Sequence, residues 1–199
     1  MVKCIWCINM KDKYNLTIDQ NVFLVKKLLV VIIYNSAKLE GLNVTFPETQ
    51  TILDGINVPS VKLDDITCML NLRDAWREIL VNLDTDLDLS YICKINSLVS
   101  RNESLEWGVL RNGKVGIAGT DYIPDIPVEE LVIEEINEIL EIENITLRAI
   151  KYMPYGMRKQ LFWDGNKRTS TIIANKIMIQ NGKGIITIKE EYLFNLINY

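Results

Sequence analysis

The chain has 199 residues, of which 48% are hydrophobic and 24% are charged, a composition typical of a globular protein with a sizeable apolar core. Its net charge of −4 at pH 7 argues against a broad basic surface for nucleic acid. The sequence contains no histidine, which excludes every mechanism that needs an imidazole from this chain.

Apolar runs and cysteines favour a cytoplasmic protein without a membrane partner. The longest apolar run, Leu28–Tyr34, is too short to cross a bilayer, and Met1–Tyr14 lacks the continuous apolar segment of a signal peptide. Cys4 and Cys7 have metal-like spacing, but the other two cysteines form no second pair. We therefore expect reduced, buried thiols rather than a zinc site.

Two capping boxes predict the first two helices. Thr17-Ile-Asp-Gln20 begins a helix that we expect to run to Glu40, with Gly41 as its left-handed end. The box at Thr45–Glu48 opens a shorter helix that ends near Gly55.

Later in the chain the pattern is mostly helical. Apolar periodicity predicts helices over residues 64–82, 86–99, 128–143, 146–159, 169–180 and 190–198. Residues 107–117 instead alternate around Asn112-Gly113, which predicts a β-hairpin. We therefore expect a mainly α-helical bundle with one hairpin, as a single domain over residues 1–199. Its N-terminal helix covers about 17–41 and its main bundle about 64–199.

A polar turn precedes the helix near the C-terminal end. Asp164-Gly-Asn166 predicts a tight turn, and Lys167 and Arg168 follow it. The N–H groups of a helix start and two fixed cations would together bind an anion such as phosphate. Asp164 adds an oxygen ligand suited to Mg²⁺. The tripeptide alone is more often only a turn and a helix cap.

The longer string Gln160-Leu-Phe-Trp-Asp-Gly-Asn-Lys-Arg168 resembles the Fic family signature, His-x-Phe-x-Asp/Glu-Gly-Asn-Gly/Lys-Arg, with Gln160 in place of the His. The resemblance implies a Fic-type helical bundle with a β-hairpin flap, and ATP and Mg²⁺ as cofactors. It also implies that Phe162 points into the core while Gln160 reaches toward the reacting end of the nucleotide. The implied binding residues are Asp164 for the metal, Gly165, Asn166 and Lys167 for the phosphates, and Arg168 for their β/γ end.

The predicted hairpin occupies the place of the family's flap. In Fic enzymes the flap is implied to hold a protein target by strand addition. The corresponding edge here would be Val115, Gly116, Ile117, Ala118, Gly119, Thr120 and Asp121. An ordinary surface hairpin is the alternative.

A third feature, Ser36-Ala-Lys-Leu-Glu40-Gly41, resembles the family's autoinhibitory motif Ser/Thr-x-x-x-Glu-Gly/Asn. The motif's Glu is implied to obstruct the γ-phosphate, and a carboxylate does compete with phosphate for cations. Thr171 stands where many members have a second Arg, so Glu40 would have to pair with Lys167 or Arg168. The alternative is that Glu40 and Gly41 simply end a helix.

The activity implied by the resemblance is AMP transfer from ATP to a protein hydroxyl. An amide cannot accept the hydroxyl proton as the family's His does, and a general base is worth ~10²–10⁴ in rate. We therefore expect transfer to be impaired or absent because of Gln160. The alternatives are a catalytically silent domain that binds nucleotide or protein, a phosphotransferase resembling the Doc branch through Lys167, and a plain helical interaction domain. The target protein stays unidentified, and a homo-oligomer is compatible with the sequence.

Overall fold

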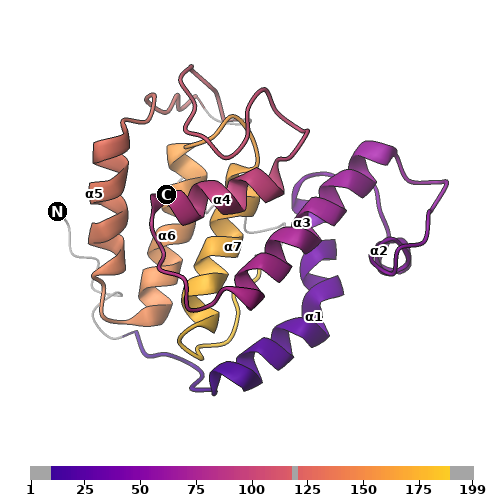
Figure 1. Ribbon diagram of the computed structural model, residues 1–199, viewed down its shortest axis with the longest axis horizontal. Coiled ribbons are helices and arrows are strands. Elements are labelled where there is room, and N and C mark those ends of the chain that lie inside the picture. Colours follow the sequence, from indigo (N-terminus) through magenta and orange to yellow (C-terminus); the bar gives the residue numbers. More distant parts are fainter. Residues whose placement is uncertain (1–9, 118–120, 189–199) are drawn as a thin grey trace.

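The computed structural model describes residues 10–117 and 121–188 (Figure 1). Within these ranges the chain forms seven α-helices and no strands. They are α1 (Ile18–Leu39), α2 (Phe46–Leu53), α3 (Leu63–Val81), α4 (Leu89–Val99), α5 (Glu129–Leu140), α6 (Ile145–Lys159) and α7 (Asn166–Ile179). The predicted helix at 190–198 and the Cys4–Cys7 pair lie outside the described residues.

The two predicted capping boxes are present, and α4 also begins with a side-chain cap. The Thr17 side chain accepts the N–H of Gln20 and the Gln20 side chain accepts the N–H of Thr17, and Thr45 and Glu48 repeat this box at α2. Asp88 caps α4 by accepting the N–H of its third residue. Each cap satisfies N–H groups that the helix cannot pair, which typically stabilises it by ~1 kcal/mol.

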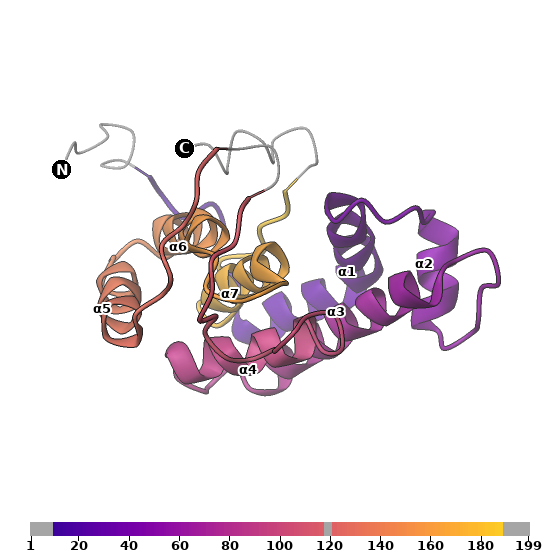
Figure 2. The same cartoon turned by 90° about the horizontal axis from the view of Figure 1, so that it is seen from above.

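The antiparallel helices α6 and α7 form the centre of the bundle (Figures 1 and 2). Helices α3 and α4 pack on α7, α1 packs on α3 and α7, and α5 packs on α6. The short helix α2 rests on α1 and α3, on the opposite side of the molecule from α5 (Figure 1). The bundle thereby brings the C-terminal end of α1 to the N-terminal end of α7.

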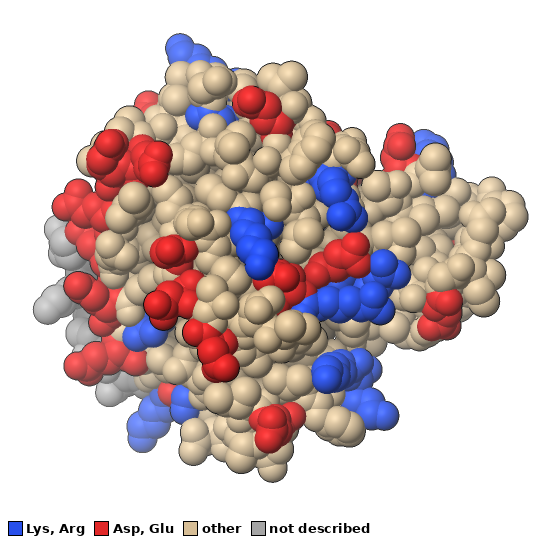
Figure 3. Space-filling model, in the orientation of Figure 1, with Lys and Arg blue, Asp and Glu red and all other residues tan. Residues whose placement is uncertain are grey.

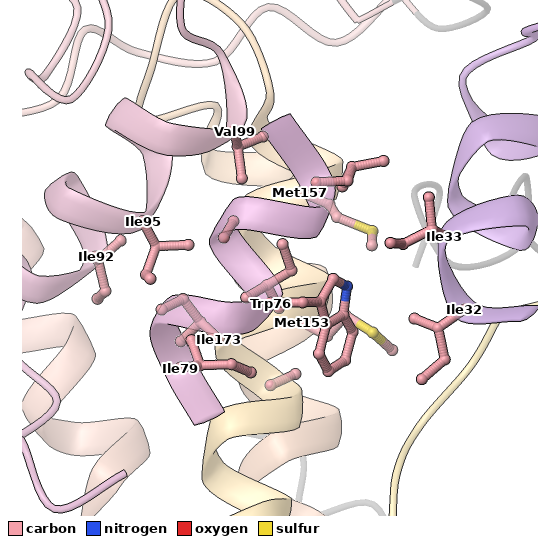
Figure 4. Packing of buried hydrophobic residues seen from close by; sticks show 14 of the residues in the cluster. Ile32, Ile33, Trp76, Ile79, Ile92, Ile95, Val99, Met153, Met157 and Ile173 are labelled. Atoms are coloured by element: carbon pink, nitrogen blue, oxygen red, sulfur yellow. The ribbon is translucent and has the colours of Figure 1, made fainter. Parts of the chain in front are cut away.

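One contiguous apolar core joins these helices. Trp76 of α3 lies at its middle, close to Met153 and Met157 of α6 and to Ile32 and Ile33 of α1 (Figure 4). Full burial of such side chains contributes about 1.5–3 kcal/mol each. No described helix is both long and apolar enough to cross a membrane.

The predicted β-hairpin over 107–117 is wrong for the described chain. Residues 107–117 are irregular, as is Asp121, while Ala118, Gly119 and Thr120 lie outside the described residues. The expected fold class is therefore correct in its helical bundle, and the strand edge expected at Val115, Gly116 and Ile117 is not seen.

The side chain of Arg111 explains why this segment is held without a strand ladder. Arg111 is 1% exposed, and its guanidinium donates hydrogen bonds to the carbonyl oxygens of Gly113 at 2.5 Å and Asp125 at 2.6 Å. Its Nε donates to the Gln160 carbonyl at 2.5 Å, and its backbone N–H donates to that of Leu161 at 3.0 Å. The Arg111 side chain thus donates hydrogen bonds to backbone carbonyls in three segments of the chain. These bonds hold the segment in place of the interstrand hydrogen bonds of a hairpin.

Gly156 sets the distance between α6 and α7. A Cβ atom at this position would lie 2.3 Å from Oγ and 3.1 Å from Cβ of Ser170. We expect Gly156→Ala to lower the free energy of unfolding by ~1–3 kcal/mol, because overpacking outweighs alanine's better helix propensity. Urea unfolding measures this change.

The matched experiment introduces Gly156→Ala into a Ser170→Gly background, where the space is free. There the substitution should be neutral or stabilising, as a double-mutant cycle would record. The same destabilisation in both backgrounds would contradict the packing argument.

Candidate functional site

The predicted anion-binding turn connects α6 to α7. Gln160 ends α6 in the left-handed conformation, with φ 49°, and Gly165 precedes α7 with φ 71°. A side chain at Gly165 would meet Val99 at 2.9 Å and Ser100 at 3.2 Å, so the turn needs glycine for conformation and for space. Because α7 begins at Asn166, three residues earlier than expected, Lys167 and Arg168 lie in its first turn.

The side chain of Asn166 stabilises this turn. Its Oδ1 accepts the Phe162 N–H at 3.0 Å, and its Nδ2 donates to the Phe162 carbonyl at 2.8 Å. From α4, Asn96 donates through Nδ2 to the Asp164 carbonyl at 3.0 Å. Phe162 is buried in the core, as expected. Asn166 therefore shapes the turn through its side chain.

The start of α7 offers N–H groups without a side-chain cap. Gly165 has no side chain, and the Asp164 carboxylate accepts the Gly165 N–H at 2.5 Å. The first intrahelical hydrogen bond runs from the Thr169 N–H to the Gly165 carbonyl. The preceding N–H groups and the positive end of the helix dipole therefore point out of the turn, as in phosphate sites.

Arg168 is a buried cation, only 4% exposed, with two differently bound sides. Its Nη1 donates to Glu103 at 2.7 Å, and also contacts the Val99 carbonyl at 3.2 Å and the Cys68 sulfur at 3.1 Å. This contact with Glu103 has the length of a strong charge-assisted hydrogen bond. Glu103 therefore anchors the inward side of the guanidinium.

The outward side of Arg168 is bound more loosely. Nε lies 3.8 Å from a Glu40 oxygen and Nη2 lies 3.5 Å from Asp164. Nε is buried and has no hydrogen-bond partner. Both distances exceed a good N–H···O hydrogen bond, so this edge has capacity for another acceptor.

Glu40 reaches the site from the end of α1, where Gly41 follows with φ 76°. Its carboxylate lies 3.5 Å from Nζ of Lys167 and 3.8 Å from Nε of Arg168, which is the pairing expected when Thr171 replaces a second Arg. Ser36 donates its hydroxyl to the Ile32 carbonyl of its own helix. Ser36 thus lies beside the site with its hydroxyl bonded within α1, and its carbonyl accepts the backbone N–H of Glu40 at 3.2 Å.

Little space remains between Glu40 and the two cations. The pocket lined by Ser36, Leu39, Glu40, Met157, Lys167, Arg168 and Thr171 has a volume of about 10 Å³. A cavity of this size holds about one water molecule. A nucleotide phosphate could enter here only after the Glu40 side chain moves.

Burial and the neighbouring charges determine the ionisation states of Arg168 and Cys68. Burial opposes the charged form of Arg168, but nearby negative groups, among them Glu40 and Glu103, outweigh burial and raise the pKa of Arg168. Burial also raises the pKa of the Cys68 thiol to about 12, against the opposing effect of Arg168. Cys68 is therefore a neutral thiol at physiological pH, and the carboxylates supply the negative charge that stabilises Arg168.

The Gln160 side chain is bonded within the turn. Its Nε2 donates to the Met157 carbonyl at 2.6 Å, and its Oε1 accepts from Asn166 at 3.1 Å. Both ends of the amide are thus occupied by protein groups. The predicted reach of Gln160 toward a nucleotide would require breaking these hydrogen bonds.

Asp164 is the carboxylate expected to hold Mg²⁺. Its side chain is half-exposed, and no group of three or more acidic, cysteine or histidine side chains suited to a metal occurs among the described residues. Mg²⁺ is commonly held by one or two carboxylates together with substrate phosphates. The residues therefore fit Mg²⁺ only as a partner of bound phosphate.

The segment that replaces the expected hairpin lies against the turn. Trp163 packs where a side chain at Gly113 would stand, with its ring 2.4 Å from that position, and Arg111 bonds the Gln160 carbonyl. Arg111 and Gly113 thus attach this segment to the turn just before the residues that were predicted to form the flap edge. Sequence reasoning missed Asn96, Glu103 and Arg111, whose partners lie far away in the sequence.

Known proteins share this fold and part of the sequence. The chain is 25% identical over 169 residues to the protein adenylyltransferase Fic of Drosophila erecta, covering 80% of this chain and 34% of that protein. The corresponding protein of Aedes aegypti is 24% identical over 185 residues, covering 87% and 37%. The chain thus spans about a third of the length of the curated relatives that it matches. No family model matches the sequence.

Solved structures give the same result for the fold. A Fic domain containing signaling protein of Bacteroides thetaiotaomicron superposes with a TM-score of 0.73 at 21% identity, covering 92% of this chain and 74% of that one. Fic-1 of C. elegans gives 0.72 at 19%, covering 94% and 57%. The helical bundle is therefore a Fic fold. The curated relatives add a similarity in sequence, so the chain resembles Fic proteins in both fold and sequence.

The anchoring of Arg168 by Glu103 predicts a stability difference. Glu103→Ala should lower the free energy of unfolding by ~1–3 kcal/mol, because it leaves the buried guanidinium short of an acceptor. Glu103→Gln keeps an acceptor and should cost less. Glu106→Ala, which removes an exposed carboxylate three residues away, is the control, and equal losses from Glu103→Ala and Glu106→Ala in urea unfolding would refute the anchor.

Proposed function

We propose that this chain is a nucleotide-binding Fic domain whose site is held closed by Glu40 and whose AMP transfer is weak or absent. The observation that carries the proposal is the outward edge of Arg168, where a buried Nε without a hydrogen bond faces Glu40. An unsatisfied cationic donor beside a helix N-terminus favours an anionic ligand. A carboxylate at that place competes with phosphate for the same donors.

In the proposed complex, Lys167 and the first N–H groups of α7 bind phosphate oxygens, and Arg168 binds the phosphates nearest Glu40. Asp164 would hold Mg²⁺ together with those phosphates, and a bound Mg²⁺ would supply charge neutralisation at the leaving group. The protein's own contribution to transfer is then positioning and electrostatic stabilisation.

Gln160 limits the reaction in this proposal. Transfer to a hydroxyl needs a group that takes the hydroxyl proton, and an amide cannot take it at neutral pH. No histidine in this chain can substitute, and a metal-bound Asp164 would be a poor base. The chain would therefore bind nucleotide without efficient turnover, and a silent nucleotide- or protein-binding role is the second candidate.

AMP is the proposed group because the curated relatives are named adenylyltransferases. Lys167, in the place of the commoner Gly, supports phosphate transfer as a third candidate. ATP labelled at the α-phosphate or at the γ-phosphate distinguishes the two reactions, because each label reaches protein in only one of them.

We expect removal of the Glu40 carboxylate to tighten ATP binding. Glu40→Gly should lower the Kd for ATP with Mg²⁺ by about tenfold or more, because the phosphates gain charge-assisted hydrogen bonds worth ~1.5–3 kcal/mol. AMP, which lacks the β- and γ-phosphates, should gain less. Isothermal titration calorimetry measures both affinities.

The matched control is Glu40→Gln, which keeps the size of the side chain and removes its charge. Tightening by both variants supports charge competition, whereas tightening by Glu40→Gly alone supports steric obstruction. In the Glu40→Gly background, Arg168→Ala should weaken ATP binding again by ~10-fold or more. Equal gains for ATP and AMP, or no binding by any folded variant, would refute the site.

The last prediction for this site concerns the missing base. Glu40→Gly combined with Gln160→His should transfer AMP from α-labelled ATP to the protein itself or to an added protein. Its rate should exceed that of Glu40→Gly alone by ~10²–10⁴. Gln160→Asn is the matched variant, because it changes the side chain without supplying a base.

Brisk transfer by the unaltered chain would contradict the role assigned to Gln160. A double variant that binds ATP and transfers nothing would instead favour the silent binding protein.

A further inference from the structure

A groove of about 800 Å³ lies between α4, α5 and residues 108–110. Leu89 and Cys93 of α4 and Ile133 and Ile136 of α5 contribute to its lining, together with Val109 and Leu110. None of these residues contributes to the phosphate site described above. The volume is within the range of pockets that hold drug-sized ligands, and so can take several side chains of a partner.

Apolar side chains are exposed on both walls of this groove. Val109 is 46% exposed on one wall and Ile133 is 41% exposed on the other. These two side chains and the buried residues between them give the groove an apolar surface that a partner could cover. Burying these two side chains beneath a partner would remove apolar area from water.

Carboxylates stand at the groove beside this apolar lining. Asp88 begins α4 and Glu129 begins α5, and both line the groove. Burial raises the pKa of the Cys93 thiol to about 11, with Glu129 and Asp88 adding to the effect, so both carboxylates act on the same lining residue. The groove's described lining includes no Lys or Arg.

The surroundings extend this negative potential. Helix α5 carries Glu129, Glu130, Glu134, Glu135 and Glu138, and acidic side chains gather along the edge of the molecule where α5 lies (Figure 3). Such a surface repels nucleic acid and anionic membranes and attracts cationic partners.

We propose that this groove binds a protein segment that carries apolar side chains flanked by Lys or Arg. Apolar residues fill the space between Val109 and Ile133, and the cations pair with Asp88 and Glu129. An amphipathic helix presents apolar and basic side chains in this way, and helix-in-groove binding is a common mode of peptide recognition. The inference does not depend on nucleotide binding.

Hydrogen bonds connect the groove to the phosphate site. Gly108 donates its N–H to Asn96 at 2.9 Å, and Asn96 donates to the Asp164 carbonyl at 3.0 Å. Arg111, one residue beyond the groove lining, bonds the Gln160 carbonyl. A partner in the groove would therefore contact the segment that holds the turn in place.

The test uses a fluorescein-labelled synthetic amphipathic peptide of leucine and lysine, with a leucine–glutamate peptide as its counterpart, and fluorescence anisotropy as the readout. The full chain should bind the lysine peptide and not the glutamate peptide, with an affinity that falls as salt rises. Ile133→Ser should weaken binding by about fivefold or more, because part of an apolar contact is lost.

Charge variants distinguish binding of the peptide in this groove from its nonspecific attraction to the acidic surface. Asp88→Asn keeps an oxygen to cap α4, and Glu129→Gln keeps the side-chain size; each should weaken binding by ~1.5- to 5-fold. Glu138→Gln removes an exposed carboxylate of the same helix that does not line the groove, and should leave binding unchanged.

Three results would overturn the proposal. The first is equal weakening by Glu138→Gln and Glu129→Gln, and the second is no binding of the lysine peptide. The third is self-association in sedimentation velocity that Ile133→Ser abolishes, because a second copy of the chain would then be the occupant.

Discussion

Neutralising the buried charge of Arg168 is the constraint on which the site depends. A guanidinium that is 4% exposed cannot remain in the bundle without nearby negative charge. That charge comes from three parts of the chain: Glu40 after α1, Glu103 after α4, and Asp164 before α7. The same cation that suits a phosphate therefore also holds α1, the end of α4 and the start of α7 together.

These three contacts differ in strength. The strong one holds Arg168 in place, and the weaker ones are those that a ligand would replace. Glu103 hydrogen-bonds the guanidinium at 2.7 Å, whereas Glu40 and Asp164 lie at 3.8 and 3.5 Å. An incoming anion would displace the weaker contacts first, because they contribute less. The anchored side keeps its geometry while the outward edge exchanges partners, which is a form of preorganisation.

Local sequence patterns predicted the helices and much of the turn, because caps and apolar periodicity act within a few residues. Thr17 and Thr45 cap helices as expected. The contact of Glu40 with Lys167 and Arg168 was instead expected from the resemblance to the family's inhibitory motif. Patterns failed where a distant side chain decided the conformation. Asn112-Gly113 indicated a hairpin, but Arg111 binds carbonyls up to 49 residues away. Asn96 and Glu103 gave no signal for the same reason, since their partners lie 68 and 65 residues away.

The attachment of residues 107–117 through the Arg111 side chain, with the Gly108 N–H bonded to Asn96, has a consequence for how the chain can change over time. A strand ladder restricts every residue along it, because each contributes to register and pairing. Here Arg111 supplies the attachment, so exposed neighbours such as Val109 and Lys114 are free to vary without loss of the attachment. The surface residues beside the turn before α7 can thus change toward new partners while Arg111 preserves the position of the segment. Substitution of Arg111 itself would release the segment, and its exposed neighbours would then lose their fixed position beside the turn.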